Sequence, residues 1–325
     1  MVESVSILIP CHNAEAWIDQ AVQSALDQTW PHCEVIIIDD GSTDRSREIL
    51  SRRTSAATVV LRENRGGNPT RNELLRMARG EWIQYLDADD YLFPDKVERQ
   101  MESMGRQPAA DMVYSPQVIE HHQGGKNWQQ LWNPHAHEGP HDPWVYHLRW
   151  SLTQLGGALF RRRTLLDVGG WNNQQQRCQD NELYFRLLKH GAAFVRCEHA
   201  GSVYRRFEGG SVSTGKPDLL RQAILGLLEE GEAYLREQDQ LTPARIQAAN
   251  GMRFRLAKEL WKSDRPAARR IVTRIKQSDP RFLPGPEEFV APVYRQVFRF
   301  AGLDGAEQAA ALARGLRRRR TVYGN

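Results

Sequence analysis

The chain has 325 residues, of which 40% are hydrophobic and 26% charged, and its formal net charge at pH 7 is +4. This composition excludes a chain that is disordered throughout, and the length is sufficient for one large domain with an appendage or for two domains. No apolar run approaches the ~20 residues that a membrane-spanning helix needs. Residues 1–4 lack the basic start of a signal peptide, and the four cysteines form no C-x-x-C pair. We therefore expect a cytoplasmic protein without a zinc site or a disulfide framework.

The positive charge is concentrated at the C-terminal end of the sequence. Residues 295–325 contain seven arginines against the two acids Asp304 and Glu307, so the remaining chain is close to neutral. A nucleic-acid-binding protein usually carries a basic face through its fold, so no nucleic-acid partner is expected. Two interpretations of this basic tail stay open. It either makes a peripheral contact with anionic lipid at the inner face of the membrane or is a solvated tail without a partner.

Short hydrophobic strands alternate with helical patterns in the first 90 residues. The predicted strands are residues 5–10, 34–38, 59–61 and 82–86, and the predicted helices between them are residues 16–26, 46–50 and 70–78. This alternation is typical of a parallel, doubly wound α/β sheet that is covered on both faces. Ligands bind at the carboxyl ends of the strands in such sheets. We therefore expect four polar loops to meet at one edge, namely residues 10–13, 39–44, 64–67 and 87–90.

The fourth predicted strand ends in a crowded acidic turn. Asp87, Asp89 and Asp90 place three carboxylates within four residues, where like charges repel and the burial of each charge is costly. Mg²⁺ or Mn²⁺ would relieve this repulsion, because hard cations take oxygen ligands and often share them with substrate phosphates. A solvated turn whose aspartate caps the next helix is the alternative. The Rossmann glycine fingerprint and the P-loop motif are both absent, so neither NAD binding nor P-loop ATP chemistry is predicted.

Four motifs in this order resemble the nucleotide-binding half of the family 2 glycosyltransferases. They are P-C-H-N at residues 10–13, I-D-D-G-S-T-D at 38–44, N-R-G-G-N-P-T-R-N at 64–72 and Y-L-D-A-D-D-Y-L-F-P-D-K at 85–96. Three later motifs resemble the acceptor-binding half: G-G-A-L-F-R-R at 156–162, V-G-G-W at 168–171 and Q-D-N-E-L-Y at 179–184. The resemblance implies a GT-A catalytic domain over residues 1–215, with residues 1–115 as the nucleotide-sugar-binding half and residues 116–215 as the acceptor-binding half.

The resemblance also implies a role for individual residues. Asp40, with Asp39 beside it, would contact the nucleobase, and the backbone around Pro10 and Asn13 would lie along the nucleoside. The residues implied to bind the nucleotide sugar are Pro10, Asn13, Asp39, Asp40, Arg71, Asp87, Ala88, Arg205 and Arg206. The implied ligands of Mg²⁺ or Mn²⁺ are Asp87, Asp89 and Asp90, with Asp89 the strongest candidate. The residues implied on the acceptor side are Gly156, Gly157, Trp171 and Gln179.

Asp180 matches the catalytic base of the family, which takes a proton from the acceptor hydroxyl at hydrogen-bond range. Its alternative role is the N-cap of an amphipathic helix, and the two roles are compatible. Two positions depart from the family pattern. Gln179 replaces a glutamate that would raise the pKa of the base through like-charge repulsion. Phe207 replaces a histidine that serves the diphosphate and metal end, and we expect Arg205 or Arg206 to compensate by pairing with phosphate.

Residues 116–150 are rich in histidine and tryptophan. Their spacing is irregular and cysteine is absent from the segment, so a zinc site is not favoured. Flat aromatic rings suit the apolar faces of sugars, and partial burial in the core is the alternative. Beyond residue 215 the pattern becomes helical, with a proline-containing linker at residues 284–286. We expect residues 216–325 to form a helical C-terminal appendage that ends in the basic tail.

The resemblance implies an inverting, hexosyltransferase-type enzyme. It would move a sugar from a UDP-, dTDP- or GDP-linked donor to a hydroxyl of a glycan, lipid-linked or small acceptor, in the synthesis of cell-surface polysaccharides or glycoconjugates. Two alternatives stay open. The first is a GT-A domain that binds nucleotide sugar without catalysis, and the second is a sugar nucleotidyltransferase, which would need a basic, glycine-rich loop after the first strand.

Overall fold

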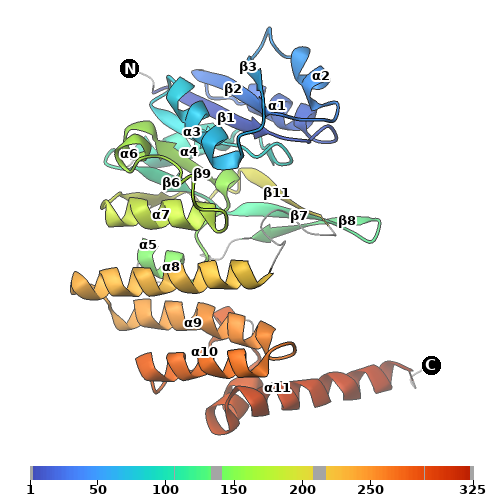
Figure 1. Cartoon of the computed structure of the whole chain (residues 1–325), viewed down its shortest axis with the longest axis vertical. Coiled ribbons are helices and arrows are strands. Elements are labelled where there is room, and N and C mark those ends of the chain that lie inside the picture. Colours follow the sequence, from blue (N-terminus) through green and yellow to red (C-terminus); the bar gives the residue numbers. More distant parts are fainter. Residues whose placement is uncertain (1–2, 106, 133–140, 208–216, 289, 323–325) are drawn as a thin grey trace. The chain divides into compact units, whose positions relative to one another are not determined.

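The computed structural model describes residues 3–105, 107–132, 141–207, 217–288 and 290–322, without the side chains of residues 287 and 314–322 (Figure 1). The chain divides into two compact units. The first comprises Met1–Pro143 and Ser151–Leu220, and the second comprises Trp144–Trp150 and Arg221–Asn325.

The first unit is built on a seven-stranded sheet in the order β10-β6-β9-β4-β1-β2-β3. Its strands are β1 Val5–Cys11, β2 Cys33–Asp40, β3 Thr58–Arg62, β4 Trp82–Tyr85, β6 Met112–Tyr114, β9 Ala158–Arg161 and β10 Phe194–Arg196. Only β9 runs antiparallel to its neighbours, whereas the other pairs are parallel. The predicted α/β fold with a mostly parallel sheet is therefore confirmed.

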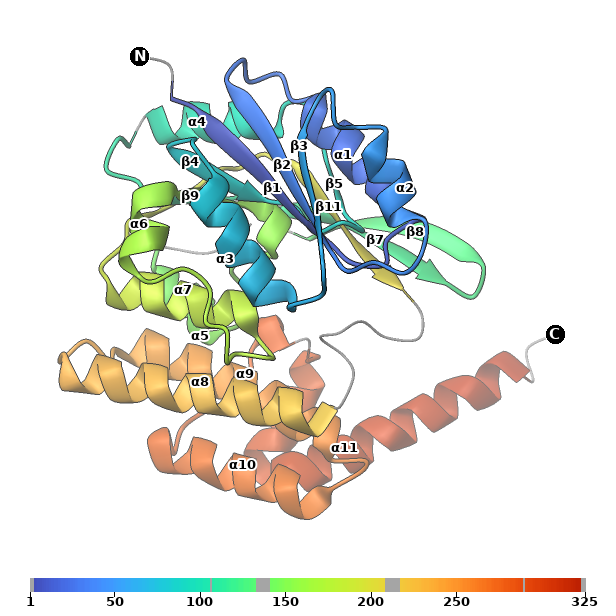
Figure 2. The same ribbon diagram turned by 45° about the horizontal axis from the view of Figure 1, so that its top comes forward.

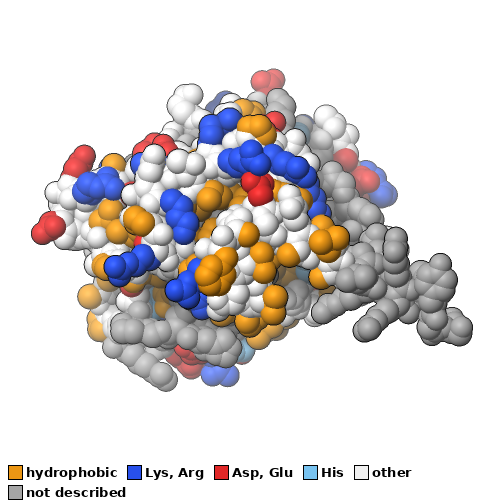
Figure 3. All heavy atoms as spheres, turned by 90° about the horizontal axis from the view of Figure 1, so that it is seen from below, with side chains coloured by type: hydrophobic (Ala, Val, Ile, Leu, Met, Phe, Trp, Pro, Cys, Tyr) orange, Lys and Arg blue, Asp and Glu red, His pale blue; other side chains and the backbone are white. Residues whose placement is uncertain are grey.

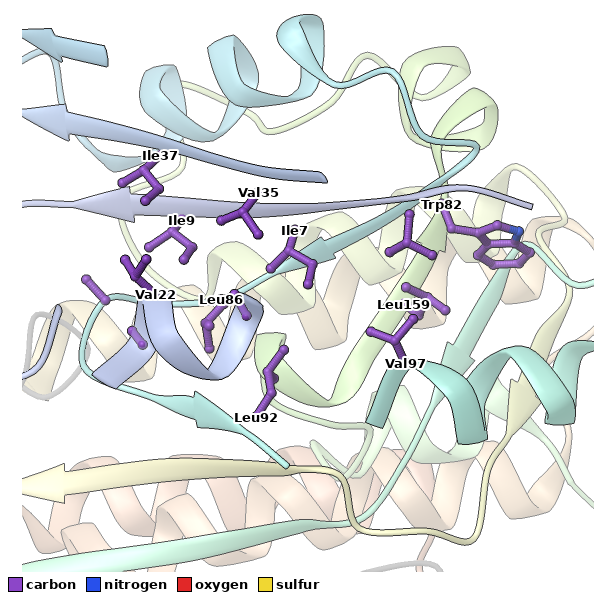
Figure 4. Close-up of a cluster of buried hydrophobic side chains, with 14 of the residues drawn as sticks. Ile7, Ile9, Val22, Val35, Ile37, Trp82, Leu86, Leu92, Val97 and Leu159 are labelled. Carbon is purple, nitrogen blue, oxygen red and sulfur yellow. The ribbon is translucent and has the colours of Figure 1, made fainter. Parts of the chain in front are cut away.

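Helices cover both faces of this sheet (Figure 2). They are α1 Ile18–Leu26, α2 Ser46–Ser51, α3 Gly67–Met77, α4 Lys96–Gly105, α6 Arg162–Asp167 and α7 Gln179–Lys189. Alternate residues of β1 and β2, including Ile7, Ile9 and Ile37, pack with Val22 of α1 and Val97 of α4 in one buried cluster (Figure 4). On the other face, Phe160 of β9 stacks on Tyr184 of α7. Burial on both faces explains why these strands are nearly continuous hydrophobic runs.

A second sheet of four strands, in the order β5-β11-β7-β8, was not predicted. Its strands are β5 Tyr91–Leu92, β7 Gln117–Gln123, β8 Lys126–Trp132 and β11 Ser202–Phe207. Strands β7 and β8 are rich in Gln and His and lack a clear alternation of apolar residues, which is why the hydrophobic pattern missed them. The available signal was Gly124-Gly125, because both residues have positive φ, +59° and +71°, as a two-residue hairpin turn requires.

The second unit is helical, as predicted for the C-terminal region. It contains most of α5 Pro143–Leu148 and of α8 Pro217–Glu237, and all of α9 Pro243–Leu260, α10 Arg265–Ser278 and α11 Pro292–Val322. Helix α11 has a break at Gly302, where φ is +64°. The segment Trp144–Trp150 belongs to this unit and not to the acceptor half in which the sequence analysis placed it. The reason is packing, because Trp144 stacks on Tyr234 of α8. No helix in the described part of the chain is both long and apolar enough to cross a membrane.

Candidate active site

The acidic turn after β4 carries buried negative charge. Asp90 is only 3% exposed, and its Oδ1 accepts a hydrogen bond of 2.8 Å from the backbone N–H of Arg205. Burial and then the charge of Asp87 raise the pKa of Asp89 to about 6. Burial, followed by Asp89 and Asp87, raises the pKa of Asp90 well above its usual value. The carboxylates therefore repel one another in a setting that poorly stabilises their charge, and a bound cation would offset this repulsion.

The donor chemistry of this turn fits Mg²⁺ or Mn²⁺. In the described ranges, no three His, Cys, Asp or Glu side chains form a preformed metal cluster. Mg²⁺ sites in proteins often use one or two carboxylates and take their other ligands from substrate phosphates and water. Asp87 is hydrogen-bonded to Arg71, and Asp90 to the N–H of Arg205. Asp89 receives no hydrogen bond from another described residue, so its oxygens fit a cation best.

Arg71 of α3 connects the acidic turn to the start of α7. Its Nη2 donates to Asp87 Oδ1 at 2.9 Å, and its Nη1 donates to Gln179 Oε1 at 3.2 Å. The guanidinium also lies over the ring of Trp171, at 4.9 Å from the centroid. Burial lowers the pKa of Arg71, but Asp87 and then Asp180 raise it by more, so the residue stays charged. One partly buried cation thus holds together residues implied to bind the donor and residues implied on the acceptor side.

Asp180 lies in the first turn of α7, within the field of the same charges. Burial raises its pKa to about 6, Arg71 opposes this rise, and Asp87 adds to it. The structure therefore brings Asp180 into one electrostatic cluster with Arg71 and Asp87. The suggestion that Asp180 is the N-cap of α7 was wrong, because Cys178 occupies that position with φ +54° and no side chain caps the helix. No described residue donates a hydrogen bond to the Asp180 carboxylate.

Two asparagines of α3 fix the loop that leads to Asp180. Asn72 accepts from the backbone N–H of Trp171 at 2.8 Å and donates to its carbonyl oxygen at 2.8 Å. Asn68 donates to the carbonyls of Asn172 and Gln175 at 2.7 and 3.0 Å. Sequence reasoning missed these roles. The signal was the spacing, because positions 68, 71 and 72 lie on one face of a helix.

Asp39 and Asp40 end β2, and the structure gives them different surroundings. Both oxygens of Asp40 accept hydrogen bonds, from the side chain of Arg62 at 2.9 and 3.0 Å and from the backbone N–H groups of Arg65 and Gly66. Asp39 Oδ1 accepts from Arg47 Nε at 2.8 Å, whereas its buried Oδ2 has no partner among the described groups. Asp40 thus fixes the glycine-containing turn before α3, and Asp39 has one buried acceptor oxygen without a partner among the described groups.

Pro10 and Asn13 lie at the end of β1, beside this acidic pair. Asn13 adopts φ +50°, and its backbone N–H donates to Ser42 Oγ at 2.9 Å while its Oδ1 accepts from the N–H of Thr43 at 2.8 Å. These bonds join the first two of the four predicted loops. His12 is part of the same junction, because its Nδ1 lies 3.0 Å from the carbonyl oxygen of Asp40.

Arg205 braces the acidic turn and is not open to a phosphate in this structure. Its side chain donates to the carbonyl of Asp89 at 2.8 Å, to Glu120 at 2.9 Å and to Gln20 at 2.5 Å. Its guanidinium lies between the rings of Trp17 and Tyr91, at 4.5 and 4.7 Å from their centroids.

Arg206 is the next residue on β11 and lies on the opposite face of the sheet, where it is exposed. Its guanidinium lies 5.7 Å from the ring centroid of Tyr204. Phe207 packs between Trp17 and His122, with ring centroids 5.2 Å from both. Of the two arginines expected to compensate for Phe207, only Arg206 therefore has an exposed guanidinium.

Gly156 and Gly157, implied on the acceptor side by the resemblance, are buried in a polar network. Gln84 donates to the carbonyl of Gly156 at 3.1 Å, and Gln100 donates to that of Gly157 at 2.8 Å. A Cβ on Gly157 would collide with Thr153 Oγ1. The two glycines therefore permit close packing and present no surface to a ligand. Trp171 is also buried, beneath Arg71.

The histidine- and tryptophan-rich segment forms a flat aromatic surface on the β7–β8 hairpin. His121 and Trp128 stack with centroids 4.7 Å apart and planes inclined by 9°, and Trp128 is 44% exposed. Arg206 is in register with His121 on the neighbouring strand. His135 and His137 lie outside the described residues. Part of this segment thus presents aromatic rings to solvent, and part, such as Trp144, is buried.

The sequence profile of Glycosyl transferase family 2 matches residues 6–167. EpsH of Bacillus subtilis (strain 168), a protein named as a glycosyltransferase, is 32% identical in an alignment of 257 positions that covers 73% of this chain and 71% of EpsH. The chain belongs to glycosyltransferase family 2. WfaP of Escherichia coli, a UDP-Glc:α-D-GlcNAc-diphosphoundecaprenol β-1,3-glucosyltransferase, is 36% identical over 105 residues, or 32% of this chain and 42% of WfaP. Apart from EpsH, the chain spans about two fifths of the length of the first curated relatives that it matches.

Two solved structures define the fold of this family 2 glycosyltransferase. TarS 1–349 of S. aureus, in complex with UDP-GlcNAc, matches 97% of this chain and 92% of its own length, with a TM-score of 0.56 and 14% identity. The mannosyltransferase PcManGT of Pyrobaculum calidifontis, in complex with GDP-Man and Mn²⁺, matches 86% of this chain and 88% of its own, with a TM-score of 0.51 and 18% identity. The predicted GT-A fold is therefore confirmed.

Proposed function

We propose that this family 2 glycosyltransferase transfers a sugar, with inversion, from a nucleoside-diphosphate sugar to an acceptor hydroxyl, with Asp180 as the base. The observation that carries the proposal is the position of Asp180, whose carboxylate lies close enough to Arg71 and Asp87 for both charges to shift its pKa. A base must reach the acceptor hydroxyl while the donor is held on the other side of the reacting carbon. The raised pKa of about 6 suits this task, because the carboxylate is ionised at neutral pH yet basic enough to take a proton.

We propose that the donor binds along the carboxyl ends of β1, β2 and β4. Asp39 Oδ2, buried and unpaired among the described groups, would accept a hydrogen bond from the nucleobase. Pro10 and Asn13 would line the nucleoside, and Asp40 would act by holding the turn before α3. Asp87 and Ala88 would contact the sugar nucleotide, with Arg71 holding Asp87 in place. Arg206, whose side chain is exposed on β11, would pair with a phosphate of the donor.

Asp89 would be the principal ligand of Mg²⁺ or Mn²⁺, with Asp87 and Asp90 as its neighbours in the site. A bound divalent cation supplies Lewis-acid stabilisation of the negative charge that develops on the leaving diphosphate. The structure of PcManGT in complex with GDP-Man and Mn²⁺ supports the use of a divalent cation. Arg205 would hold the backbone of Asp89 and the carboxylate of Asp90 in the geometry that the cation requires.

For the acceptor, we propose a glycan or a lipid-linked glycan in the synthesis of a cell-surface polysaccharide, used on the cytoplasmic side of the membrane. The name of WfaP, which acts on a diphosphoundecaprenol-linked sugar, supports an acceptor of this class. The exposed rings of Trp128 and its stacking partner His121 would contact sugar units next to the reacting one, because flat rings suit the apolar faces of pyranoses.

A donor screen tests this proposal. The full chain is incubated with UDP-, GDP- and dTDP-sugars and Mn²⁺, and the released products are measured. We expect release of a nucleoside diphosphate from at least one donor, increased by an acceptor glycan. In a parallel reaction with a nucleoside triphosphate and a sugar 1-phosphate, release of pyrophosphate would instead identify a sugar nucleotidyltransferase. Mn²⁺-dependent binding of a donor with no release in the presence of any acceptor would identify a non-catalytic binding domain.

A further inference from the structure

The first half of α11 has two apolar faces, of which only one is buried. Phe298 packs into the core of the second unit, with its ring centroid 5.2 Å from that of Phe254 and 6.5 Å from that of Phe282. At about 100° per residue, Val293 and Phe300 lie roughly half a turn around the helix from Phe298. They are 74% and 82% exposed. A helix that packs one face on the core normally turns a polar face to solvent, so this outward apolar face calls for a partner.

Arginines without ion pairs accompany this apolar face. Arg299 lies beside Phe300, with its guanidinium carbon 5.8 Å from the ring centroid. On α10, Arg270 and Arg274 are exposed, one turn apart, and border a shallow hollow of about 540 Å³. Among the described side chains, none of these three arginines pairs with an acid. The neighbouring Arg269 differs, because it pairs with Asp304 of α11 at 2.8 Å.

Contacts within the unit place these groups on adjoining helices. The pair between Arg269 and Asp304 joins α10 to α11, and Lys276 of α10 lies 5.5 Å from the ring centroid of Phe298. Figure 3 shows the face on which α10 and α11 lie, where hydrophobic side chains gather among Lys and Arg and acidic side chains are sparse. Five exposed residues of these two adjoining helices, Arg270, Arg274, Val293, Arg299 and Phe300, are together called the α10–α11 surface.

We propose that the α10–α11 surface docks onto a membrane rich in anionic lipid. Exposed apolar side chains next to unpaired arginines have the composition of an element that inserts at a lipid interface, with the guanidinium groups on the headgroup phosphates. Charge favours lipid over a second copy of the chain, since two such surfaces would place like charges together. The apolar residues favour lipid over nucleic acid, because binding to a polyanion in water would leave the exposure of Val293 and Phe300 unexplained.

The basic residues 317–320, for which lipid contact was one of two interpretations of the sequence, belong to the same helix, but their side chains lie outside the described residues. The proposal therefore rests on the α10–α11 surface alone. It is also independent of the proposed glycosyl transfer, because lipid binding needs neither donor nor acceptor.

Vesicle sedimentation of the full chain tests the proposal. The probes are vesicles of phosphatidylcholine alone and vesicles with one third phosphatidylglycerol, without nucleotide. We expect binding to the anionic vesicles only, weakened by salt. The variant V293S/F300S should bind at least about tenfold more weakly because apolar burial is lost, and R270Q/R274Q should also bind about tenfold or more weakly because two lipid contacts are lost.

Matched controls come from exposed residues of the first unit. Leu166 is 42% exposed, and the side chain of Arg163 is 88% exposed, so L166S and R163Q should bind vesicles as the wild type does. The proposal is overturned if wild-type protein binds both vesicle types equally or neither, or if the controls lose as much binding as the surface variants. It is also overturned if V293S/F300S binds normally, which would indicate charge attraction to any polyanion, or if the surface variants abolish self-association of the chain instead of vesicle binding.

Discussion

Arg71 Nη1 donates a hydrogen bond of 3.2 Å to Gln179 Oε1, and Nη2 of the same guanidinium donates to Asp87 at 2.9 Å. Because Gln179 directly precedes Asp180, this partly buried arginine couples the acidic turn to the proposed base. A change of charge at any of these residues should therefore change the electrostatic environment of the others.

Replacing Gln179 with glutamate should raise the pKa of Asp180. The new carboxylate would stand beside Asp180, and like charges favour the protonated form. Since the pKa of Asp180 is already about 6, we expect kcat of the wild type to fall below about pH 6, as Asp180 becomes protonated. In the variant the pH of this fall should be higher by about 0.5–1 unit. The measurement is nucleoside diphosphate release against pH. The exposed Gln176 provides the control Q176E, and an unchanged or lowered limb in Q179E would contradict the prediction.

Replacing Asp180 with asparagine should remove activity and stabilise the fold at neutral pH. The folded-state pKa of about 6 lies above the usual 3.8, so ionisation opposes folding. The wild-type chain therefore loses stability as pH rises from about 4 through 6. Asparagine mimics the protonated group, so the free energy of unfolding of D180N at pH 7.5 should exceed that of the wild type by about 1–3 kcal/mol.

Urea unfolding at pH 7.5 and at pH 4 measures this effect. At pH 4 the wild-type carboxyl is mostly protonated, so the difference from D180N should nearly vanish. Asp167, whose side chain is 47% exposed in a surface pair with Arg163, gives the control D167N, which should change stability by less than about 0.5 kcal/mol at either pH. A D180N variant less stable than the wild type at pH 7.5 would show that the carboxylate has a structural partner.

Arg205 and Arg206 form a matched pair for testing the brace on the acidic turn. R205M removes the buried ion pair with Glu120 and the bond to the carbonyl of Asp89, and we expect a loss of about 3–5 kcal/mol in the free energy of unfolding. R206M changes an exposed side chain and should lose less than about 0.5 kcal/mol. R205K keeps the charge but not the five donors, so it should fold yet need more Mn²⁺ for half-maximal donor binding. Equal Mn²⁺ requirements in R205K and wild type would argue against the brace.

Gly169 and Gly170 give a second matched pair, with φ of +82° and +67°. An alanine at either position should cost roughly 1 kcal/mol from the backbone conformation. A Cβ at Gly170 would also come within 2.5 Å of Asn72 Oδ1, whereas a Cβ at Gly169 meets nothing within 4 Å. G170A should therefore displace the side chain of Asn72, which holds the backbone of Trp171. We expect kcat at saturating donor to fall at least about tenfold more in G170A than in G169A. Equal kcat values would show that the contact between Asn72 and Trp171 does not position Asp180.

The fold was predictable because its signals are local, but much of the site was not. The run Val-Ile-Ile-Ile in β2 and the order of the polar loops lead directly to a doubly wound sheet. The roles of Asn68 and Asn72 depend on a loop about 100 residues later, and no periodic pattern encodes such a contact. Arg205 shows the same limit, because its sequence position near Phe207 suggested a phosphate ligand, whereas packing between Trp17 and Tyr91 makes it a brace.

The central claim, that one acid binds the cation and donor while another removes the proton, is tested most directly by comparing D89N and D180N. Donor binding is followed by thermal shift with and without Mn²⁺, and turnover by nucleoside diphosphate release, using a donor identified by the screen. We predict that D180N keeps Mn²⁺-dependent donor binding but loses at least about 100-fold in kcat, whereas D89N loses the Mn²⁺-dependent shift itself. Turnover that survives in D180N, or Mn²⁺-dependent binding that survives in D89N, would contradict the account.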